Sequence, residues 1–176
     1  PFKTHPRREV LLADNAHPPE KFGCTTCHEG QGVAVNSVKQ AHGELGLWEF
    51  PLLRGASAQS SCTSCHLDVQ KFADDAPLLV EGQRLFEQVG CTGCHLVKGY
   101  ENIPKIAPSL LKISAKVDPS WMVRWIENPH KFRPRTRMPN FLFTQYPAQK
   151  DYPVQIAAYL LSTSKAPGDE WLAANA

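Results

Sequence analysis

Residues 80–95 read VEGQRLFEQVGCTGCH and contain the pattern that decides the fold of the second half of the chain. The apolar residues of this stretch fall near one helical face: Val80, Leu85, Phe86 and Val89. This spacing predicts an amphipathic helix over 80–89. Gly90 follows, and a cysteine pair with a histidine comes directly after it. The sequence therefore predicts a helix whose C-terminal end runs into a Cys-x-x-Cys-His motif.

The same pentapeptide pattern occurs three times and uses every cysteine in the chain. The copies are Cys24-Thr-Thr-Cys27-His28, Cys62-Thr-Ser-Cys65-His66 and Cys91-Thr-Gly-Cys94-His95. Two thiols three positions apart can each form a thioether with a haem vinyl group, and the next residue then places its imidazole on the iron. We therefore expect three covalently attached haem c groups, with the cysteines as thioether donors and His28, His66 and His95 as proximal iron ligands.

Three other interpretations of the cysteines fit the pattern less well. A disulfide framework would suit an exported chain with six cysteines, but it does not explain a histidine after every pair. A zinc site uses two such pairs per metal, or one pair with two spaced histidines, so three pairs are an odd number for zinc. A thioredoxin-like redox motif needs a surrounding βαβ pattern, which is not visible. Zinc is the stronger of these alternatives.

Composition excludes several other classes of protein. The chain has 176 residues, of which 42% are hydrophobic and 20% charged, as expected for a soluble globular protein of one or two domains. A net charge of +2 provides no basic surface for nucleic acid. No apolar run approaches the roughly 18 to 20 residues of a membrane span. Because the chain opens at Pro1 without a leader pattern, we expect a processed mature chain or an excised fragment, with any signal or anchor removed.

The distribution of loop and helix signals divides the chain near residue 76. Residues 1–76 carry two of the motifs and many prolines and glycines, with a short helical stretch at 33–42. This region has too few residues per haem for an apolar core of its own, so the porphyrins must supply much of it. We predict a mainly α protein with little or no β-sheet, made of a loop-rich dihaem region, 1–76, and a monohaem helical domain, 77–176.

Two further helices are predicted in the second half. Asp118-Pro119 is typical of an N-cap followed by proline at the first helical position, and Asn128-Pro129 stops that helix. Its apolar face contains Trp121, Met122, Trp125 and Ile126. Pro153 opens another helix, which ends before Pro167.

Four segments of the second half occur in a characteristic order. They are Gly82-Gln-Arg-Leu-Phe86 before the third motif, then Ala107-Pro108-Ser-Leu110, Arg137-Met138-Pro139 and Ile156-Ala-Ala-Tyr159-Leu160. In these segments the chain resembles the single-haem class I cytochrome c fold. The resemblance implies that the first and last helices cross beside the haem through Phe86 and Tyr159. It also implies that Pro108 helps to hold the proximal histidine and that Met138 is the sixth iron ligand. Ala107 stands where the family commonly has glycine.

The first half has a looser resemblance to another group of proteins. Its recognisable run extends from Phe22 through the first motif to Gly32 and is followed by Ala41-His42-Gly43. This run is similar to the multihaem cytochromes of respiratory bacteria, and the similarity implies compact haem packing.

The sixth iron ligands must come from a small set of residues outside the motifs: His5, His17, His42, His130, Met122 and Met138. Met138 is our choice for the third haem, since it lies in a proline-bounded loop after the middle helix. His130 is its nearest competitor and is otherwise a solvated loop residue. Met122 lies on a predicted apolar helix face, where core packing is the expected role.

The first two haems must then draw on three histidines. His17 precedes Cys24 by seven residues, a reach that suits a loop folding back over a haem, and His42 ends a short helical stretch. His5 lies near the terminus and is otherwise a frayed surface residue. We prefer His17 and His42 over His5 as distal ligands, and the sequence leaves open which haem each one serves.

These features favour an electron carrier over an enzyme. Histidine–methionine ligation raises the reduction potential relative to bis-histidine ligation, so the third haem should have the highest potential. We expect a relay between redox partner proteins in bacterial respiration, in the periplasm or at the cell exterior, where haem attachment is completed. The alternatives are a haem enzyme of the peroxidase or nitrite-reductase type with one open site, and a haem-bearing subunit of a larger respiratory assembly.

Overall fold

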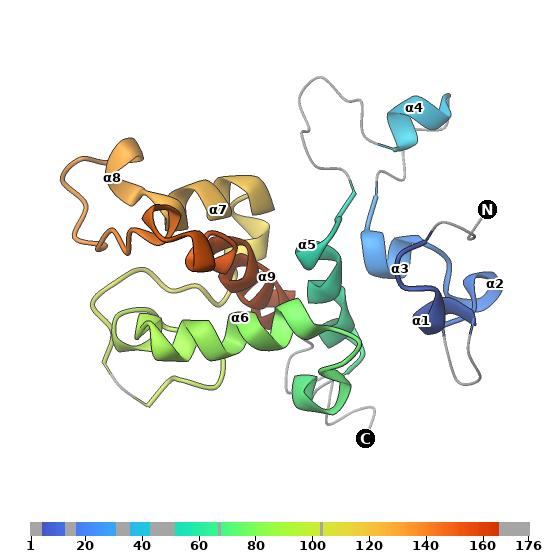
Figure 1. The fold of residues 1–176 in the computed structure, drawn as a ribbon, viewed down its shortest axis with the longest axis horizontal. Helices are drawn as coiled ribbons and strands as arrows, with labels where there is room; N and C mark the ends of the chain where they lie inside the picture. Colours follow the sequence, from blue (N-terminus) through green and yellow to red (C-terminus); the bar gives the residue numbers. More distant parts are fainter. Residues whose placement is uncertain are drawn as a thin grey trace. The chain divides into compact units, whose positions relative to one another are not determined.

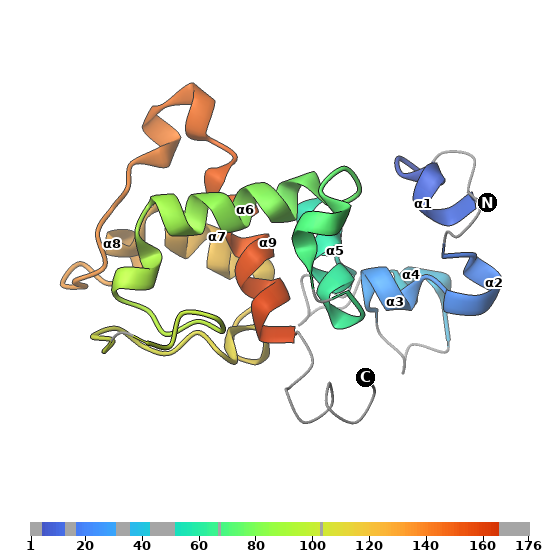
Figure 2. The same ribbon diagram turned by 90° about the horizontal axis from the view of Figure 1, so that it is seen from below.

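The computed structural model describes residues 5–12, 17–30, 36–42, 52–66, 68–102 and 104–165. Within these ranges the chain is helical and contains no β-strand, which confirms the mainly α fold (Figures 1 and 2). The α-helices are α1 (Arg8–Leu12), α2 (Pro19–Phe22), α3 (Thr25–His28), α4 (Val38–Ala41), α5 (Ala56–Gln59), α6 (Pro77–Gln88), α7 (Pro119–Glu127), α8 (Pro129–Phe132) and α9 (Tyr152–Lys165). Shorter 3₁₀ segments are η1 (Ser60–Ser64), η2 (Val69–Phe72), η3 (Cys91–Gly93), η4 (Ile113–Ala115), η5 (Phe143–Gln145) and η6 (Pro147–Gln149).

The chain divides into two compact units, residues 1–53 and 54–176. The boundary proposed from sequence, between residues 76 and 77, therefore falls inside the second unit. This unit contains the second haem motif as well as the third. None of the described helices is both long enough and apolar enough to cross a membrane.

The segment before residue 77 is joined to α6 by a helix cap. Pro77 opens α6, and the preceding Ala76 has no side chain that can accept a hydrogen bond. Gln59 at the end of α5 provides the acceptor, because its Oε1 receives the backbone N–H groups of Leu78 (2.9 Å) and Leu79 (3.1 Å). Capping of this kind satisfies donors that the helix itself leaves unpaired. The second motif begins only three residues after Gln59 and is thereby held at the N-terminal end of α6.

The second motif is also attached to the last helix. Thr63, inside the motif, is buried, and its hydroxyl lies 3.0 Å from the carbonyl oxygen of Ser162 in α9 and 3.0 Å from that of Ser60. A hydroxyl carries one proton, which these two acceptors share. Segments 99 positions apart in the sequence are thus joined inside the second unit.

Replacing Thr63 by valine should weaken this junction. The change keeps the side-chain shape but removes a buried donor, so we expect the free energy of unfolding to fall by about 1–2 kcal/mol. Denaturant unfolding of the haem-loaded protein measures the change. Thr92→Val is the matched control, because Thr92 occupies the same position in the third motif without this link to α9. Equal losses in the two variants would contradict a structural role for the Thr63–Ser162 contact.

Helices α6 and α9 cross closely, and α9 also packs against α7 (Figures 1 and 2). At the crossing, a Cβ atom added to Gly82 would lie 2.0 Å from the carbonyl oxygen of Gln155, so only glycine fits. One turn further along α6, the rings of Phe86 and Tyr159 pack with their centroids 5.4 Å apart. This confirms the helix crossing implied by the resemblance.

The core of the second unit lies between these helices. Its most completely buried apolar side chains come mainly from α6 and α9: Leu79, Leu85, Phe86, Val97, Ile156 and Leu161. Met122 and Ile126 of α7 join the same cluster, with 3% and 5% of their surface exposed. The prediction that Met122 is a core residue is therefore confirmed.

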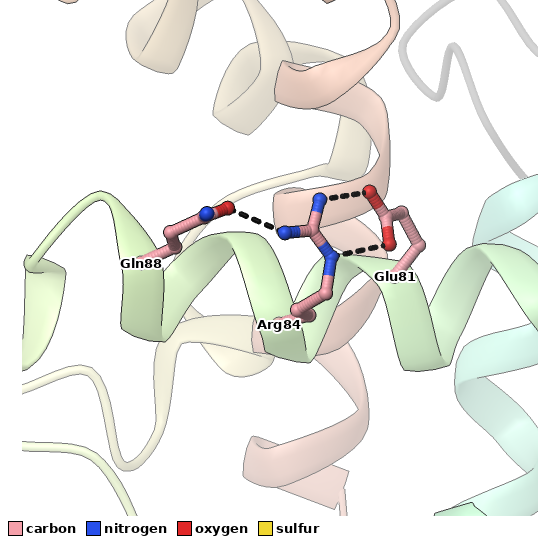
Figure 3. Close-up of polar contacts among 3 residues, drawn as sticks. All are labelled: Glu81, Arg84 and Gln88. Atoms are coloured by element: carbon pink, nitrogen blue, oxygen red, sulfur yellow. Dashed lines mark hydrogen bonds and ion pairs between the residues drawn. The ribbon is translucent and has the colours of Figure 1, made fainter.

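The outer face of α6 carries a polar network. Figure 3 shows the guanidinium group of Arg84 reaching Glu81 on one side and Gln88 on the other. The Arg84 Nε atom donates to a Glu81 oxygen at 2.7 Å, and this hydrogen bonding holds the pKa of Glu81 below its usual value. Because the pair is largely exposed, solvent screens it and it adds little to stability.

Local sequence signals account for α7. Asp118 caps its start, with Oδ1 accepting the backbone N–H of Trp121 at 2.8 Å, and Pro119 is the first helical residue. The helix ends at Glu127, before Asn128 and Pro129, as predicted. Asn128 in turn caps the short helix α8 through the backbone N–H of Lys131, at 3.2 Å.

The first unit has very little apolar core. Its helices α1 to α4 each have four or five residues. Among its described side chains, Leu53 is the one buried apolar residue. Of the stretch predicted as helical at 33–42, residues 33–35 lie outside the described ranges and α4 covers Val38–Ala41. The small core agrees with the expectation that another group supplies apolar contacts in this region.

Candidate haem sites

The third motif follows α6 after two residues, Val89 and Gly90. Gly90 has a φ of 85°, a left-handed conformation that glycine adopts without strain, and it turns the chain from α6 into η3. The backbone N–H of His95 donates to the carbonyl oxygen of Cys91 at 3.0 Å, so the motif closes into one turn. The turn places both cysteines and the histidine in one short segment directly after α6.

His95 is oriented by the loop that follows it. Its Nδ1 atom lies 2.8 Å from the carbonyl oxygen of Pro108, which confirms the role that the resemblance implied for Pro108. A carbonyl oxygen only accepts, so Nδ1 carries the proton and Nε2 keeps the lone pair that an iron ion requires. Two backbone bonds fasten the same loop to the motif, from Ala107 to Cys94 (3.0 Å) and from Leu110 to Leu96 (2.9 Å).

Met138 lies on the loop after α8, and its side chain is half-buried. The indole Nε1–H of Trp125 donates to its sulfur at 2.9 Å, and its own backbone N–H donates to Thr136 Oγ1 at 3.2 Å. A thioether sulfur has two lone pairs, so the Trp125 bond leaves one for an iron ion. The sulfur is therefore held in place without losing its capacity as a ligand.

His130, the competitor of Met138, is directed at the backbone of the same loop. Its Nε2 lies 3.1 Å from the carbonyl oxygen of Met138, and its Nδ1 lies 3.4 Å from that of Pro134. The ring is exposed. These contacts give His130 a structural role in shaping the loop around Met138.

An aromatic cluster supports the loop from the side of α7. Trp121 and Trp125 stack with their ring centroids 5.1 Å apart, and Phe132 of α8 contacts both at 5.9 and 6.0 Å. Such contacts add stability beyond the area that they bury. The cluster fixes Trp125, and Trp125 in turn fixes the sulfur of Met138.

The second motif lies in η1 and the turn after it. The backbone N–H of His66 donates to Cys62 at 2.9 Å, which is the same closure as in the third motif. Cys62 packs against the core of the second unit, as does Cys91. The ring of His66 lies 5.2 Å from that of Phe72 and is exposed. One core therefore supports both motifs of this unit.

The first motif repeats the histidine arrangement of the third. The Nδ1 atom of His28 lies 2.7 Å from the carbonyl oxygen of Leu53, and the N–H of Leu53 donates back to the carbonyl oxygen of His28 at 2.8 Å. The proton is again on Nδ1, and Nε2 is left for a metal. The reciprocal pair anchors the motif to the end of the first unit.

The three remaining histidines have different surroundings. The ring of His5 lies 6.0 Å from that of His28. The half-buried His17 packs against Phe22 at 5.1 Å, and His42 is exposed at the end of α4. The structure thus brings His5 to a motif histidine, although the sequence favoured the other two as ligands.

The cysteines have the form that thioether chemistry requires. None of the six forms a disulfide, so the disulfide framework considered from the sequence is absent from this structure. Within the described residues, no three or more His, Cys, Asp or Glu side chains gather to hold a metal ion. Burial raises the pKa of Cys91 to about 11, so its thiol is protonated at neutral pH and resists oxidation. Cysteine pairs without a disulfide, together with the Nδ1 contacts of His28 and His95 to backbone carbonyl groups, fit covalent haem.

Sequence reasoning missed two residues of these sites. Leu53 positions His28 through its backbone, which leaves no side-chain signal in the sequence. Trp125 was placed only on an apolar helix face. Its N–H was the available signal, because a partly buried indole usually donates to a partner.

Comparison with known proteins finds a family match in the second half of the chain. Residues 79–164 match the family model described as Cytochrome c, whose members are generally electron carriers. No curated protein and no solved structure matches the chain. The matched residues run from α6 to α9 and include the third motif, Pro108 and Met138. The match supports a c-type cytochrome with covalently bound haem c.

Proposed function

We propose that this chain is a trihaem cytochrome c that relays electrons between redox partner proteins in bacterial respiration, in the periplasm or at the cell exterior. The observation that carries the proposal is the position of the second and third motifs at the two ends of α6, within one compact unit. Haem supplies the redox chemistry, and the chain provides attachment, axial ligands and a fixed arrangement.

The arrangement in the second unit suits transfer between two haems. Helix α6 has 12 residues, which at 1.5 Å per residue gives a length of roughly 18 Å. Gln59 and Thr63 hold the second motif at its start, and the third motif follows its last turn. Cofactors attached at these two places are close enough for their large ring systems to approach one another, which favours electron transfer.

The proposed ligands order the haems by potential. Met138 would serve the third haem opposite His95, and histidines would serve the other two. Methionine ligation favours the ferrous state more than histidine ligation does. Electrons entering at the bis-histidine haems would therefore collect at the third haem before they leave for a partner.

Spectropotentiometry of the purified holoprotein tests this proposal directly. We expect the mass of the mature chain to include three haems, the reduction to proceed in three one-electron steps, and carbon monoxide to leave the native spectrum unchanged. Binding of carbon monoxide without denaturant would show an open iron site and favour the haem enzyme alternative. A mass with fewer than three haems would contradict the relay.

Trp125→Phe tests how the protein adjusts the third haem. The variant keeps an aromatic ring in the cluster but removes the N–H that donates to the sulfur of Met138. Without this donor the sulfur becomes a better electron donor to ferric iron, so we expect the highest reduction potential to fall while the haem content is unchanged. Trp121→Phe is the matched control. Trp121 belongs to the same aromatic cluster, but the hydrogen bond to the sulfur of Met138 comes from Trp125. Equal shifts in both variants would argue against this role of the hydrogen bond.

A further inference from the structure

We infer that His5 and His28 are the two axial ligands of the haem on the first motif. This assignment rests on the proposed function and deepens it, because it selects one partner among the three histidines that the sequence left open. The evidence lies entirely within the first unit, which contains His5, the first motif and Leu53.

The separation of the two rings agrees with ligation of one iron. Their centroids lie 6.0 Å apart with an angle of 79° between the ring planes. A metal–imidazole nitrogen bond is about 2 Å long, so two imidazoles on opposite sides of one metal have their nitrogens about 4 Å apart and their ring centroids about 6 Å apart. Rotation about the metal–nitrogen bonds leaves the angle between the planes unrestricted, and nearly perpendicular rings are compatible with this geometry.

Both rings make their backbone contact through Nδ1, but with opposite roles for that atom. The Nδ1 atom of His28 is bonded to the carbonyl oxygen of Leu53, which leaves Nε2. The Nδ1 atom of His5 accepts the backbone N–H of Arg7 at 3.2 Å, so in this structure the ring proton is on Nε2. Ligation of iron through Nε2 would require the proton on Nδ1, and the contact with Arg7 would then be given up.

The position of His5 beside His28 is partly shielded from solvent. His5 is half-buried, and the chain turns immediately after it into α1. The side chains of Arg7 and Glu9 form an ion pair across this turn. His17 instead packs its ring on Phe22, and His42 follows the last residue of α4.

His5→Phe separates ligation from simple ring packing. Phenylalanine keeps an aromatic ring beside His28 but has no nitrogen for iron. We expect the haem-loaded variant to gain a high-spin ferric signal in electron paramagnetic resonance and to bind a single equivalent of carbon monoxide, whereas the wild type binds none. An unchanged spectrum would show that the rings only pack together and would overturn the assignment.

Two further variants identify the haem that is affected. Replacing Cys24 and Cys27 together by alanine removes the attachment of the first haem. In that background, His5→Phe should add no carbon monoxide binding; added binding would mean that His5 serves another haem and would overturn the inference. His5→Met should restore a six-coordinate low-spin signal and raise one of the lower reduction potentials. If no reduction potential rises in this variant, the inference that His5 ligates the first haem is overturned.

The outcome for wild type separates this inference from the proposed function. If the wild type itself binds carbon monoxide, an iron site is open and the proposed relay fails. If neither the wild type nor His5→Phe binds carbon monoxide, and their electron paramagnetic resonance spectra are the same, the relay stands and the pairing of His5 with His28 fails.

Discussion

Replacing Gly82 by alanine is expected to reduce the free energy of unfolding by about 3 kcal/mol, at the upper end of the range for overpacked sites. The added Cβ would lie 2.0 Å from the carbonyl oxygen and 2.6 Å from the carbonyl carbon of Gln155. Both are backbone atoms inside α9, and neither can rotate away. Alanine favours a helix over glycine by roughly 1 kcal/mol, which is too little to offset separating the two helices.

The consequence should extend from stability to haem content. The crossing of α6 and α9 joins the third motif, which follows α6, to the second motif, which is bonded to α9 through Thr63. Denaturant unfolding followed by circular dichroism measures the stability, and the absorbance of the purified protein measures the haem bound. We expect both to fall in the Gly82→Ala variant.

Arg84→Ala is the matched control for this prediction. Arg84 lies on the same helix, but its bonds with Glu81 and Gln88 are on the exposed face (Figure 3). Solvent screens such pairs, so the unfolding midpoint should change far less than in Gly82→Ala. A Gly82→Ala protein as stable as Arg84→Ala would mean that the helices are not in close contact at this point.

Replacing Met138 by histidine is expected to produce the largest change in redox behaviour. If Met138 serves the third haem, the variant converts histidine–methionine ligation into bis-histidine ligation. The ferric state gains relative to the ferrous state, so the highest reduction potential should fall towards those of the other two haems. Potentiometric titration followed in the visible spectrum measures the shift, and an unchanged highest potential would rule out Met138 as the ligand.

Met122→Leu provides the comparison within the same domain. Met122 is 3% exposed and belongs to the apolar cluster between α6, α7 and α9. A leucine of similar volume should cost less than about 1.5 kcal/mol of stability and should leave the highest reduction potential unchanged. A redox shift in this variant comparable to that of Met138→His would indicate a general effect of methionine loss on the domain.

Features encoded by neighbouring residues could be predicted from the sequence. The helices that became α6, α7 and α9 follow from apolar spacing and proline, and Asp118 caps α7 because a capping side chain acts only three residues along the chain. The Cys-x-x-Cys-His motifs are equally local, since two cysteines and a histidine lie within five positions, and haem attachment at all three stays a prediction. The contact of Pro108 with His95 followed from the resemblance to class I cytochromes c.

The start of α6 shows where local signals are ambiguous. The sequence placed a boundary next to Pro77, because polar residues and proline are typical of loops. The same residues are also typical of a helix start, and Pro77 is the first residue of α6. Local composition does not distinguish these two cases. The distinction came from Gln59, 18 positions before Pro77, whose side chain accepts the first N–H groups of the helix.

By itself, then, the sequence determined the helical class of the fold and the approximate limits of its longer helices, and its three Cys-x-x-Cys-His motifs led to the prediction of three haems. Only the tertiary structure decided that the second motif packs in the same unit as the third, that α9 requires glycine at position 82, that Trp125 holds the sulfur of Met138, and that His5 lies beside His28. Each of these contacts joins residues from 13 to 99 positions apart, such as Trp125 with Met138 and Thr63 with Ser162. Helical spacing and caps operate over three or four residues, so contacts at this range are settled only when the helices pack.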